Sequence, residues 1–372
     1  MTTLSPQSPP NPRMPAEWAE HEACLMVWPT RASLWGPAYE AAKREYAAVA
    51  RAIADFEPVI MIAAPGLADE ARAALGDPAP RAAGDAPAPA PRDTGADTAR
   101  GHGIEVIELP ADDSWLRDSG PIFAHDEQGN RVGVDFRFNA WGEKHHPWTA
   151  DDKLASLLLD RLGVERVHSS MVLEGGAVTV DGEGTLITTE QCLLHPNRNP
   201  RMSRTEIEDE LGRRLGIEKV IWLPYGGLED TETDGHVDGV AAFVAPAKVV
   251  VSLPEDPAHP DYARMRANLA VLNASTDARG RALDVVAVPQ TTYGEVAGTP
   301  VEVGYLNFYL ANGGCVVPVG GADRSATDEA ALAVIAAALP GRKVVGVPTP
   351  VLAYGGGGVH CITQQLPKAA RA

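Results

Sequence analysis

The sequence predicts a mixed α/β fold in which one supersecondary unit is repeated five times and closed into a ring. Two observations predict it. Strand-rich stretches with turn residues at their centres start roughly every 55–65 residues, a spacing typical of a repeated unit. Helical stretches alternate with them, so the unit is ββαβ and the ring is a five-bladed propeller. In such a ring, loops from different units converge on one central site. Two separate α/β domains stay open as the alternative.

Four hairpins carry this prediction. Each has a turn between two runs rich in β-branched residues, and Asn, Asp or Gly at such turns is the best short-range hairpin signal. The segments are 120–136 with a turn at Gly129-Asn130, 177–194 with a turn at Asp181-Gly182, 238–253, and 304–320 with a turn at Asn312-Gly313. A fifth unit is expected about one period earlier, headed by VIMIAAP at 59–65.

Periodicity and a high content of Ala, Glu, Lys, Arg and Leu predict helices near 37–55, 150–163, 202–215, 259–275 and 325–339. Residues 76–100 differ, because they consist only of Gly, Asp, Pro, Ala, Arg and Thr. They cannot bury enough apolar surface to offset the entropy lost on ordering. We therefore expect one catalytic domain over 1–372, with a disordered surface insertion at 76–100 and a flexible N-terminus at 1–13.

The composition narrows the class of function. The net charge is −18 and there is no basic stripe, so a nucleic-acid partner is not expected, while an acidic field favours cationic ligands. No run approaches the ~18 apolar residues of a membrane span. The N-terminal MTTLSPQSPPNPR has no apolar stretch of a secretory signal. The four cysteines show no paired spacing, so we expect no disulfide framework, no metal and a reducing cytoplasm.

Cys361 is the candidate nucleophile. It follows a run of four glycines, Gly355 to Gly358, and His360. Such a loop can carry a thiol close to a ligand, thiolate sulfur is a strong nucleophile, and we expect the loop to be flexible and the thiol partly exposed. Gly358 is a further candidate for substrate binding. A lone cysteine is more often a small buried hydrophobe, which is how we interpret those at 24, 192 and 315, in apolar, strand-like contexts.

The segment DDSWLRDSGP at 112–121 supplies Asp118 on a loop that enters a hairpin. A carboxylate accepts two parallel N–H bonds from a planar guanidinium. Trp115 is placed to pack on a cation or an alkyl chain, and Asp112 is a further substrate-binding candidate. The alternative is a turn in which Asp and Ser bond their own backbone.

The segment EDTETDGHVDG at 229–239 supplies His236 and Asp238, which would face the same side of a strand. A histidine can take and return protons at neutral pH, and a carboxylate can orient it or bind a cation. Glu232 precedes them, and LEGGAV at 173–178 adds Glu174. The alternatives are a hard-cation site at Asp-Gly-His-Val-Asp, a solvated acidic loop, and a glycine bulge at LEGGAV.

Seven segments, in order along nearly the whole chain, resemble those of the agmatine deiminases. That family is a branch of the guanidine-modifying (pentein) superfamily and is related to bacterial-type peptidylarginine deiminases. The segments are MPAEWAEHEACLMVWP (14–29), DDSWLRDSGP (112–121), FNAWGEK (138–144), LEGGAV (173–178), CLLHPNRNP (192–200), GHVDG (235–239) and GGGGVHCITQQLP (355–367). The insertion at 76–100 departs from the family pattern.

The resemblance implies a five-bladed α/β propeller, the pentein fold, with a central site. It implies hydrolysis of agmatine to N-carbamoylputrescine and ammonia, without metal or organic cofactor, by a homo-oligomer. It further implies a role for each matching residue: Cys361 as nucleophile, His236 as general acid and base, Asp118 and Asp238 as guanidinium carboxylates, Glu174 as partner of the histidine, and Trp115 and Glu232 in the substrate pocket.

Three rivals stay open. A deiminase for another guanidine, such as arginine, peptidyl-arginine or a methylated arginine, would use the same residue types. A metal-dependent ureohydrolase would also act on guanidines, but a binuclear site needs several more His and Asp ligands than this sequence clusters. A non-catalytic guanidine- or polyamine-binding protein would not need the cysteine.

Overall fold

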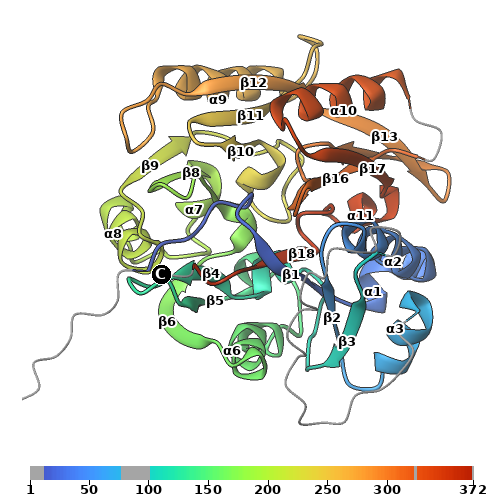
Figure 1. Ribbon diagram of the computed structural model, residues 1–372. Coiled ribbons are helices and arrows are strands. Elements are labelled where there is room, and N and C mark those ends of the chain that lie inside the picture. The colour runs from blue at the N-terminus through green and yellow to red at the C-terminus, as the bar shows by residue number, and fades with distance from the viewer. Residues whose placement is uncertain (1–11, 77–100, 322–324, 371–372) are drawn as a thin grey trace, which may run out of the picture.

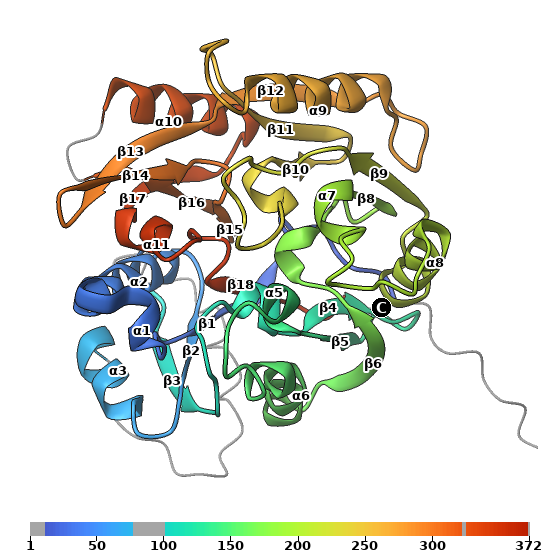
Figure 2. The ribbon, with the colours of Figure 1, turned by 180° about the vertical axis from the view of Figure 1, so that it is seen from behind.

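The strands form five sheets of three or four strands and one separate hairpin. The computed structural model describes residues 12–76, 101–321 and 325–370. The chain visits the sheets in order around a common centre, so the colours from blue to red run once around the molecule (Figures 1 and 2). The predicted ring of five α/β units is confirmed.

Each sheet repeats one pairing pattern. Its first two strands pair antiparallel and the next pairs parallel, with a helical crossover between the parallel strands, which is the connection that parallel pairing requires. Grouped by sheet, the strands are β18 (Thr363–Pro367), β1 (His21–Val27), β2 (Val59–Ala63) and β3 (Ile104–Glu108); β4 (Ile122–His125), β5 (Arg131–Arg137) and β6 (Glu165–Val172); β7 (Thr179–Val180), β8 (Thr185–Thr189) and β9 (Lys219–Leu223); β10 (Ala241–Ala245), β11 (Lys248–Leu253) and β12 (Asp284–Pro289); and β15 (Tyr309–Ala311), β16 (Gly314–Val319) and β17 (Lys343–Pro348).

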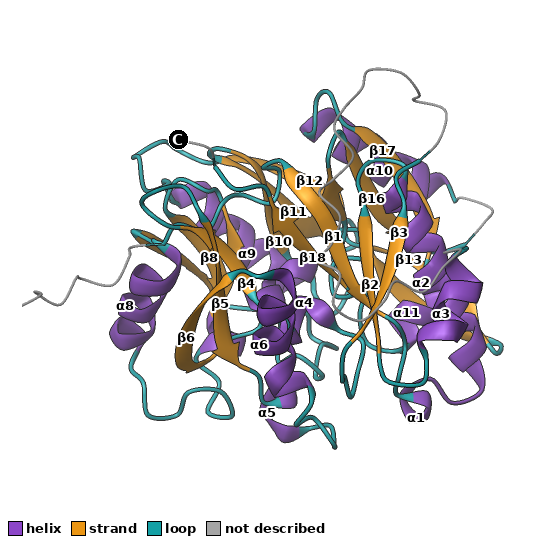
Figure 3. Ribbon diagram, turned by 60° about the horizontal axis from the view of Figure 1, so that its bottom comes forward, coloured by secondary structure: helices purple, strands orange, loops and turns teal. Residues whose placement is uncertain are grey.

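The longer helices lie on the outer side of the sheets, as α8 at one margin and α2 and α3 at the other illustrate (Figure 3). They are α2 (Tyr39–Ala54), α3 (Ala68–Leu75), α6 (Asp151–Leu162), α8 (Arg204–Leu215), α9 (Tyr262–Ala274) and α10 (Ala326–Ala338). Shorter elements lie in the connections: α1 (Ala32–Trp35), η1 (Gly36–Ala38), α4 (Leu116–Ser119), α5 (Ala140–Glu143), η2 (Gly175–Ala177), α7 (Glu190–Leu193), η3 (Val237–Gly239) and α11 (Pro350–Tyr354).

All four predicted hairpins and all five predicted helices are confirmed to within a few residues. The turn chemistry explains the agreement, since Gly129, Gly182 and Gly313 all have positive φ at the turns of their hairpins. Helix α8 starts within two residues of its predicted position, because Ser203 and Glu206 form a reciprocal capping box at its N-terminus. The hairpin of β13 (Thr291–Val296) and β14 (Thr299–Gly304) was not predicted.

The prediction that VIMIAAP heads the first unit is wrong. β2 is the third strand of that sheet, and its antiparallel pair joins β1 with β18 from the far end of the chain. Figure 1 shows the red β18 beside the blue β1 near the middle of the molecule. Sequence spacing could not reveal this pair because its two strands are separated by the other four units.

A buried polar cluster joins this first sheet to the fifth. The Glu57 carboxylate accepts hydrogen bonds from Tyr309 Oη and from the backbone N–H of Asn312, both at 2.7 Å. His21 Nδ1 lies 3.2 Å from the same carboxylate. Glu57, Tyr309 and His21 are all buried, so the cluster links the two blades where the ring closes.

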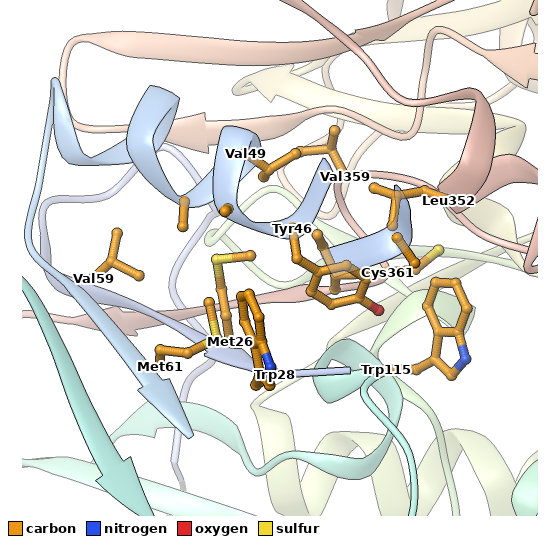
Figure 4. Close-up of a cluster of buried hydrophobic side chains, with 14 of the residues drawn as sticks. Met26, Trp28, Tyr46, Val49, Val59, Met61, Trp115, Leu352, Val359 and Cys361 are labelled. Carbon is orange, nitrogen blue, oxygen red and sulfur yellow. The ribbon is translucent and has the colours of Figure 1, made fainter. Parts of the chain in front are cut away.

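The first core cluster extends from the ring wall to the middle of the molecule. Tyr46, Val49 and Ile53 lie on one face of α2 at helical spacing and are fully buried. The same cluster reaches Trp115 and Cys361, which Figure 4 shows beside Tyr46. The packing of α2 therefore supports the loop that carries the thiol.

Most of the predicted insertion and most of the predicted flexible N-terminus, at 77–100 and 1–11, lie outside the described residues. Arg13, at the end of that N-terminal segment, exchanges two backbone hydrogen bonds with His125, at 2.8 and 2.9 Å. Across 12–76, 101–321 and 325–370, no helix has both the length and the apolar character needed to span a membrane.

Candidate active site

The thiol of Cys361 lies at the end of a glycine loop between α11 and β18. A Cβ at Gly357 would overlap the Trp115 ring and lie 3.1 Å from the Cys361 Cβ, so only glycine lets the loop pass this close. The sequence predicts a partly exposed cysteine. Cys361 is instead 8 % exposed and lines a small pocket together with Trp115, which lies near it in Figure 4.

Two polar side chains contact the sulfur. Asn307 Nδ2 donates to Sγ at 3.2 Å, and the thiol donates to Asp238 Oδ2 at 3.5 Å. Burial raises the pKa of the Cys361 thiol well above its ordinary value, and the charges of Asp238 and Asp118 raise it further. The backbone N–H of Gly358 and the Asn307 amide act in the opposite direction on that pKa. Without a cation in the pocket, the site therefore favours the neutral thiol.

Asp118 lies on the one-turn helix α4 and is fixed at both oxygens. Its Oδ2 accepts from Trp141 Nε1 and its Oδ1 from the Gly176 N–H, each at 3.0 Å. Burial raises the pKa of this carboxyl, and the His236 charge lowers it. Asp118 lines the pocket together with Cys361, so the two predicted residues do meet.

His236 and Asp238 do not lie on a strand, as the alternating pattern predicted. Val237–Gly239 is a 3₁₀ turn before β10, with His236 at its start. Both side chains nevertheless point to one place. A Cβ at Gly176 would lie 2.5 Å from His236 Nδ1, 2.9 Å from Asp118 Oδ1 and 3.0 Å from Asp238 Oδ2. The glycines of LEGGAV therefore allow three charged side chains to converge.

The buried His236 ring lies between two carboxylates, with Nδ1 3.8 Å from Asp118 and Nε2 4.0 Å from Glu174. Within the described part of the chain, neither ring nitrogen has a hydrogen-bond partner. Burial disfavours the imidazolium, but the charges of Asp118 and Glu174 help to outweigh it, so the pKa of His236 lies well above 6.5. His236 is therefore poised as a proton donor.

Glu174 is held from behind by a cation. Arg198 Nε donates to Glu174 Oε1 at 2.6 Å, and both side chains are fully buried. Arg198 also pairs with Asp234 at 2.7 Å. This arrangement fixes Glu174 and leaves its Oε2 on the side of His236.

The pocket above the thiol is lined by Leu34, Asp113, Trp115, Asp118, Trp141, His145, Glu232, Thr233, Gly355, Gly356 and Cys361. Trp115 stacks at a tilt on Trp35, with ring centroids 5.7 Å apart. Glu232 also lines the pocket, its side chain is 54% exposed, and His145 Nε2 lies 2.8 Å from its Oε2. The predicted pocket positions of Trp115 and Glu232 are therefore both on its wall.

Asp112 does not line this pocket. Its Oδ2 accepts the Ala150 N–H at 2.7 Å, next to the start of α6, and its own N–H bonds Asp151. The neighbouring Asp113 lines the pocket instead, and Arg31 holds it at 2.6 Å. Gly358 contacts the site through its backbone, near the sulfur.

Known proteins resemble this chain over nearly its whole length. Residues 13–367 match the family described as Porphyromonas-type peptidyl-arginine deiminase. The chain belongs to that family. It is 41% identical to the agmatine deiminase of Stutzerimonas stutzeri and 40% identical to that of Pseudomonas aeruginosa strain LESB58. The match to the S. stutzeri protein covers 95% of each chain. The match to the P. aeruginosa protein covers 97% of this chain and 96% of the relative.

Solved structures with this fold include agmatine deiminases. That of Enterococcus faecalis superposes with a TM-score of 0.84 at 33% identity over 97% of each chain. One from C. jejuni with substrate bound gives a TM-score of 0.82 at 25% identity over 100% of each chain. Their fold is the pentein fold expected from the sequence.

One group of side chains in this family member resembles a metal site. Glu174, Cys192 and His236 offer ligand atoms within 4.8 Å of one another, and this is the one such group among the described residues. The Arg198 guanidinium on Glu174 opposes a second cation, and a thiol is a poor ligand for the hard ions of ureohydrolases. The group fits an ion-paired histidine better than a metal site.

Cys192, predicted as a core residue in a strand-like context, is indeed fully buried but lies on the short helix α7 beside His236. Cys24 and Cys315 are core residues of β1 and β16, as predicted. Sequence reasoning missed Asn307, Glu17, Arg198 and Trp141. All but Asn307 lie in the segments that carry the family resemblance, so that resemblance was the available signal.

Proposed function

We propose that this protein is an agmatine deiminase, which hydrolyses agmatine to N-carbamoylputrescine and ammonia. The observation that carries the proposal is the meeting of two buried carboxylates, Asp118 and Asp238, with a buried thiol at Cys361. A guanidinium presents N–H groups in a fixed plane, and carboxylates accept them in matching geometry. Buried anions also need a cation, which this ligand supplies.

The bound guanidinium activates the nucleophile. Burial and the two carboxylates hold the pKa of Cys361 high in the free protein. A cation between them offsets their charge and lowers that pKa, so the thiolate forms when substrate is present. Asn307, which donates to Sγ at 3.2 Å, stabilises it. The thiol proton leaves to solvent through the pocket.

In the first step, the Cys361 thiolate attacks the guanidinium carbon and forms a C–S bond. The carbon becomes tetrahedral, and the bond to one terminal nitrogen breaks as His236 gives that nitrogen a proton. Ammonia leaves and an amidino-cysteine remains. Holding the reactants in place contributes on the order of 7–11 kcal/mol, and proton transfer about 10²–10⁴-fold.

In the second step, water attacks the same carbon and gives a proton to His236, which the first step left neutral. The C–S bond breaks as the added hydroxyl gives its remaining proton to solvent, so the thiolate is restored and the neutral ureido product leaves. Glu174 supports the charge that returns to the imidazole, 4.0 Å from Nε2. The Cys361 thiolate, the His236 proton and one water molecule balance both steps, so the proposed reaction needs no metal or organic cofactor.

The acidic lining of the pocket favours agmatine over arginine. Glu232 and Asp113 both line the pocket, and in the proposed binding mode Glu232 binds the second cation of agmatine, its amine. Arginine would bring a carboxylate into the same acidic region, where like charges repel. A deiminase for another guanidine is the second candidate, favoured by the family's description rather than by this pocket.

We also expect this protein to act in the reducing cytoplasm, because all four of its thiols are free. Self-association into a homo-oligomer is expected and is measured by sedimentation velocity.

The test is ammonia release from agmatine and arginine, with and without a chelator, by wild type, Cys361→Ala and the buried-core control Cys315→Ala. We expect chelator-resistant turnover of agmatine that only Cys361→Ala abolishes. Turnover lost on chelation, or retained in Cys361→Ala, would overturn the proposal. Preference for arginine or a peptidyl-arginine would favour the second candidate.

A further inference from the structure

Behind Asp238, a second histidine continues the polar network away from the substrate pocket. His360 Nδ1 lies 3.0 Å from Asp238 Oδ2, the same oxygen that accepts from the Cys361 thiol at 3.5 Å. His360 Nε2 lies 3.0 Å from Glu17 Oε1. The ring is 5 % exposed and is therefore fixed between two carboxylates.

The position of this pair is set by the backbone of three segments. His360 precedes Cys361, and both backbone N–H groups point to the Asn307 side-chain oxygen, at 2.9 and 3.2 Å. Glu17 comes from the first described residues of the chain, and its side chain is 13% exposed. It does not line the pocket, so it approaches the site from another side.

Arg117 completes the network. Its Nη1 lies 3.5 Å from Glu17 Oε1 and donates to the side chains of Gln364 and Gln365, at 2.8 and 2.7 Å. Its Nε donates to the His360 carbonyl at 3.3 Å. The Arg117 guanidinium is buried and held by the two glutamines of β18. It is therefore a fixed positive charge beside the Glu17–His360 pair.

We propose that Glu17 and His360 form a positioning pair that keeps Asp238 ionised and aimed at the substrate guanidinium. The proposal rests on the proposed function, because it assigns the pair to the binding step of that reaction. Neither residue touches the reacting atoms. His360 supplies the cation against which Asp238 is oriented, and Glu17 holds His360 in its charged form.

The charges around the three groups agree with this assignment. His360, His236 and Arg117 lower the pKa of Asp238 against the effect of burial, with the His360 hydrogen bond foremost. Burial and Arg117 oppose a charge on His360, but Glu17 and Asp238 outweigh them and raise its pKa. Around Glu17, burial is outweighed by His360, Arg117 and His21, so its pKa falls to about 2. The net effect is an anionic Asp238 throughout the neutral range.

These charges fix the direction in which the pH profile moves when the Glu17 charge is lost. Removing the Glu17 charge lowers the pKa of His360, and a neutral His360 no longer supports the Asp238 anion. The pKa of Asp238 then rises, and protonated Asp238 does not bind a cation. The acidic limb of kcat/KM, which reports groups of the free enzyme, moves to higher pH.

The variant to test is Glu17→Gln, which keeps the shape and removes the charge. Its matched control is Glu20→Gln on the same segment, where an exposed glutamate pairs with Lys368 at the surface. We expect Glu17→Gln to raise KM for agmatine about tenfold, the order expected for a lost charged partner. Its acidic limb should move up by about one pH unit, while kcat changes less than KM. Glu17→Asp should restore part of both, and Glu20→Gln should match wild type.

A readout without substrate separates this inference from the proposed function. Histidine-labelled protein is titrated by NMR, with the His360 signal assigned through His360→Gln. A lower His360 titration midpoint in Glu17→Gln than in wild type supports the pair even if no guanidine is turned over. Wild type active on agmatine, with Glu17→Gln indistinguishable from Glu20→Gln in KM, pH profile and titration, would overturn it. Should Glu17→Gln not fold, Glu17→Asp carries the titration comparison, and His360→Gln carries the comparison of KM and pH profile.

Discussion

Asn307 and Cys361 make three hydrogen-bond contacts with each other, although they are far apart in sequence. The amide nitrogen donates to Sγ at 3.2 Å, while the amide oxygen accepts the Cys361 N–H at 3.2 Å and lies 3.4 Å from the sulfur. Asn307 precedes β15 in the fifth sheet, and Cys361 precedes β18 in the first. The Asn307 side chain therefore fixes the proposed nucleophile across the seam between two blades.

We expect Asn307→Ala to lower kcat/KM by roughly 10–100-fold, as a lost hydrogen bond to a charged group implies. The substitution removes a donor that stabilises the thiolate and frees the loop that carries it. The rate of inactivation by iodoacetamide, measured against pH, should move to higher pH. Asn312→Ala, at the neighbouring hairpin turn, controls for general loss of stability. An unchanged inactivation profile would contradict this role for Asn307.

Asp118→Asn should move the alkaline limb of kcat to lower pH. The raised pKa of His236 means that its proton is present at neutral pH and lost only as the pH rises through that value. The Asp118 charge is the chief factor that raises it, so its removal lowers the pKa and the acid form is lost earlier. The pH–rate profile checks this, with Asp209→Asn on the exposed face of α8 as the control. A limb that stays in place would separate Asp118 from the titration of His236.

Glu232→Gln should raise KM for agmatine several-fold and leave KM for n-butylguanidine unchanged. The second compound has the same guanidinium but lacks the amine that Glu232 is expected to bind. Because the Glu232 side chain is 54% exposed, the effect should shrink as salt is added. Equal losses with both compounds would place the role of Glu232 in the loop rather than in recognition of the amine.

Glu57→Ala should lower the free energy of unfolding by about 3–5 kcal/mol, because it leaves buried partners in β1 and β15 unpaired. Tyr309→Phe removes the hydroxyl that donates to Glu57 and lies 3.2 Å from His21 Nδ1, and it should cost about 1–2 kcal/mol. Urea unfolding monitored by circular dichroism measures both. Losses of similar size in the two variants would show that the carboxylate is not the centre of the cluster.

The fold could be predicted from sequence wherever local chemistry decides it. Hairpin turns such as Gly129-Asn130 and Asn312-Gly313 and caps such as Ser203 act over a few residues, and they agree with the structure. The ring closure could not be derived in this way, because β1 and β18 carry no local sign that they pair. Strand order at the seam depends on which free edges remain after the other blades form.

The site was predictable where a residue type is matched to its chemistry. Cys361, His236, Asp118 and Asp238 do converge, although His236 and Asp238 do so from a 3₁₀ turn. The supporting residues were not predictable from chemistry alone. An asparagine such as Asn307 or a glutamate such as Glu17 is ordinary until the fold places it beside a charge. Asp112 and Asp113 illustrate the limit, since adjacent carboxylates point to different partners.

The pairing of β18 with β1 also orders events during synthesis. Cys361 and β18 follow every other element of the described chain, so a nascent chain can build the middle blades as they emerge from the ribosome. Its first sheet lacks an edge partner throughout that time, and its pocket lacks a thiol. Residue 367 must be synthesised before β18 can pair fully with β1 and close the ring. Unfinished chains therefore lack the proposed nucleophile, and one edge of β1 stays unpaired until the last strand arrives.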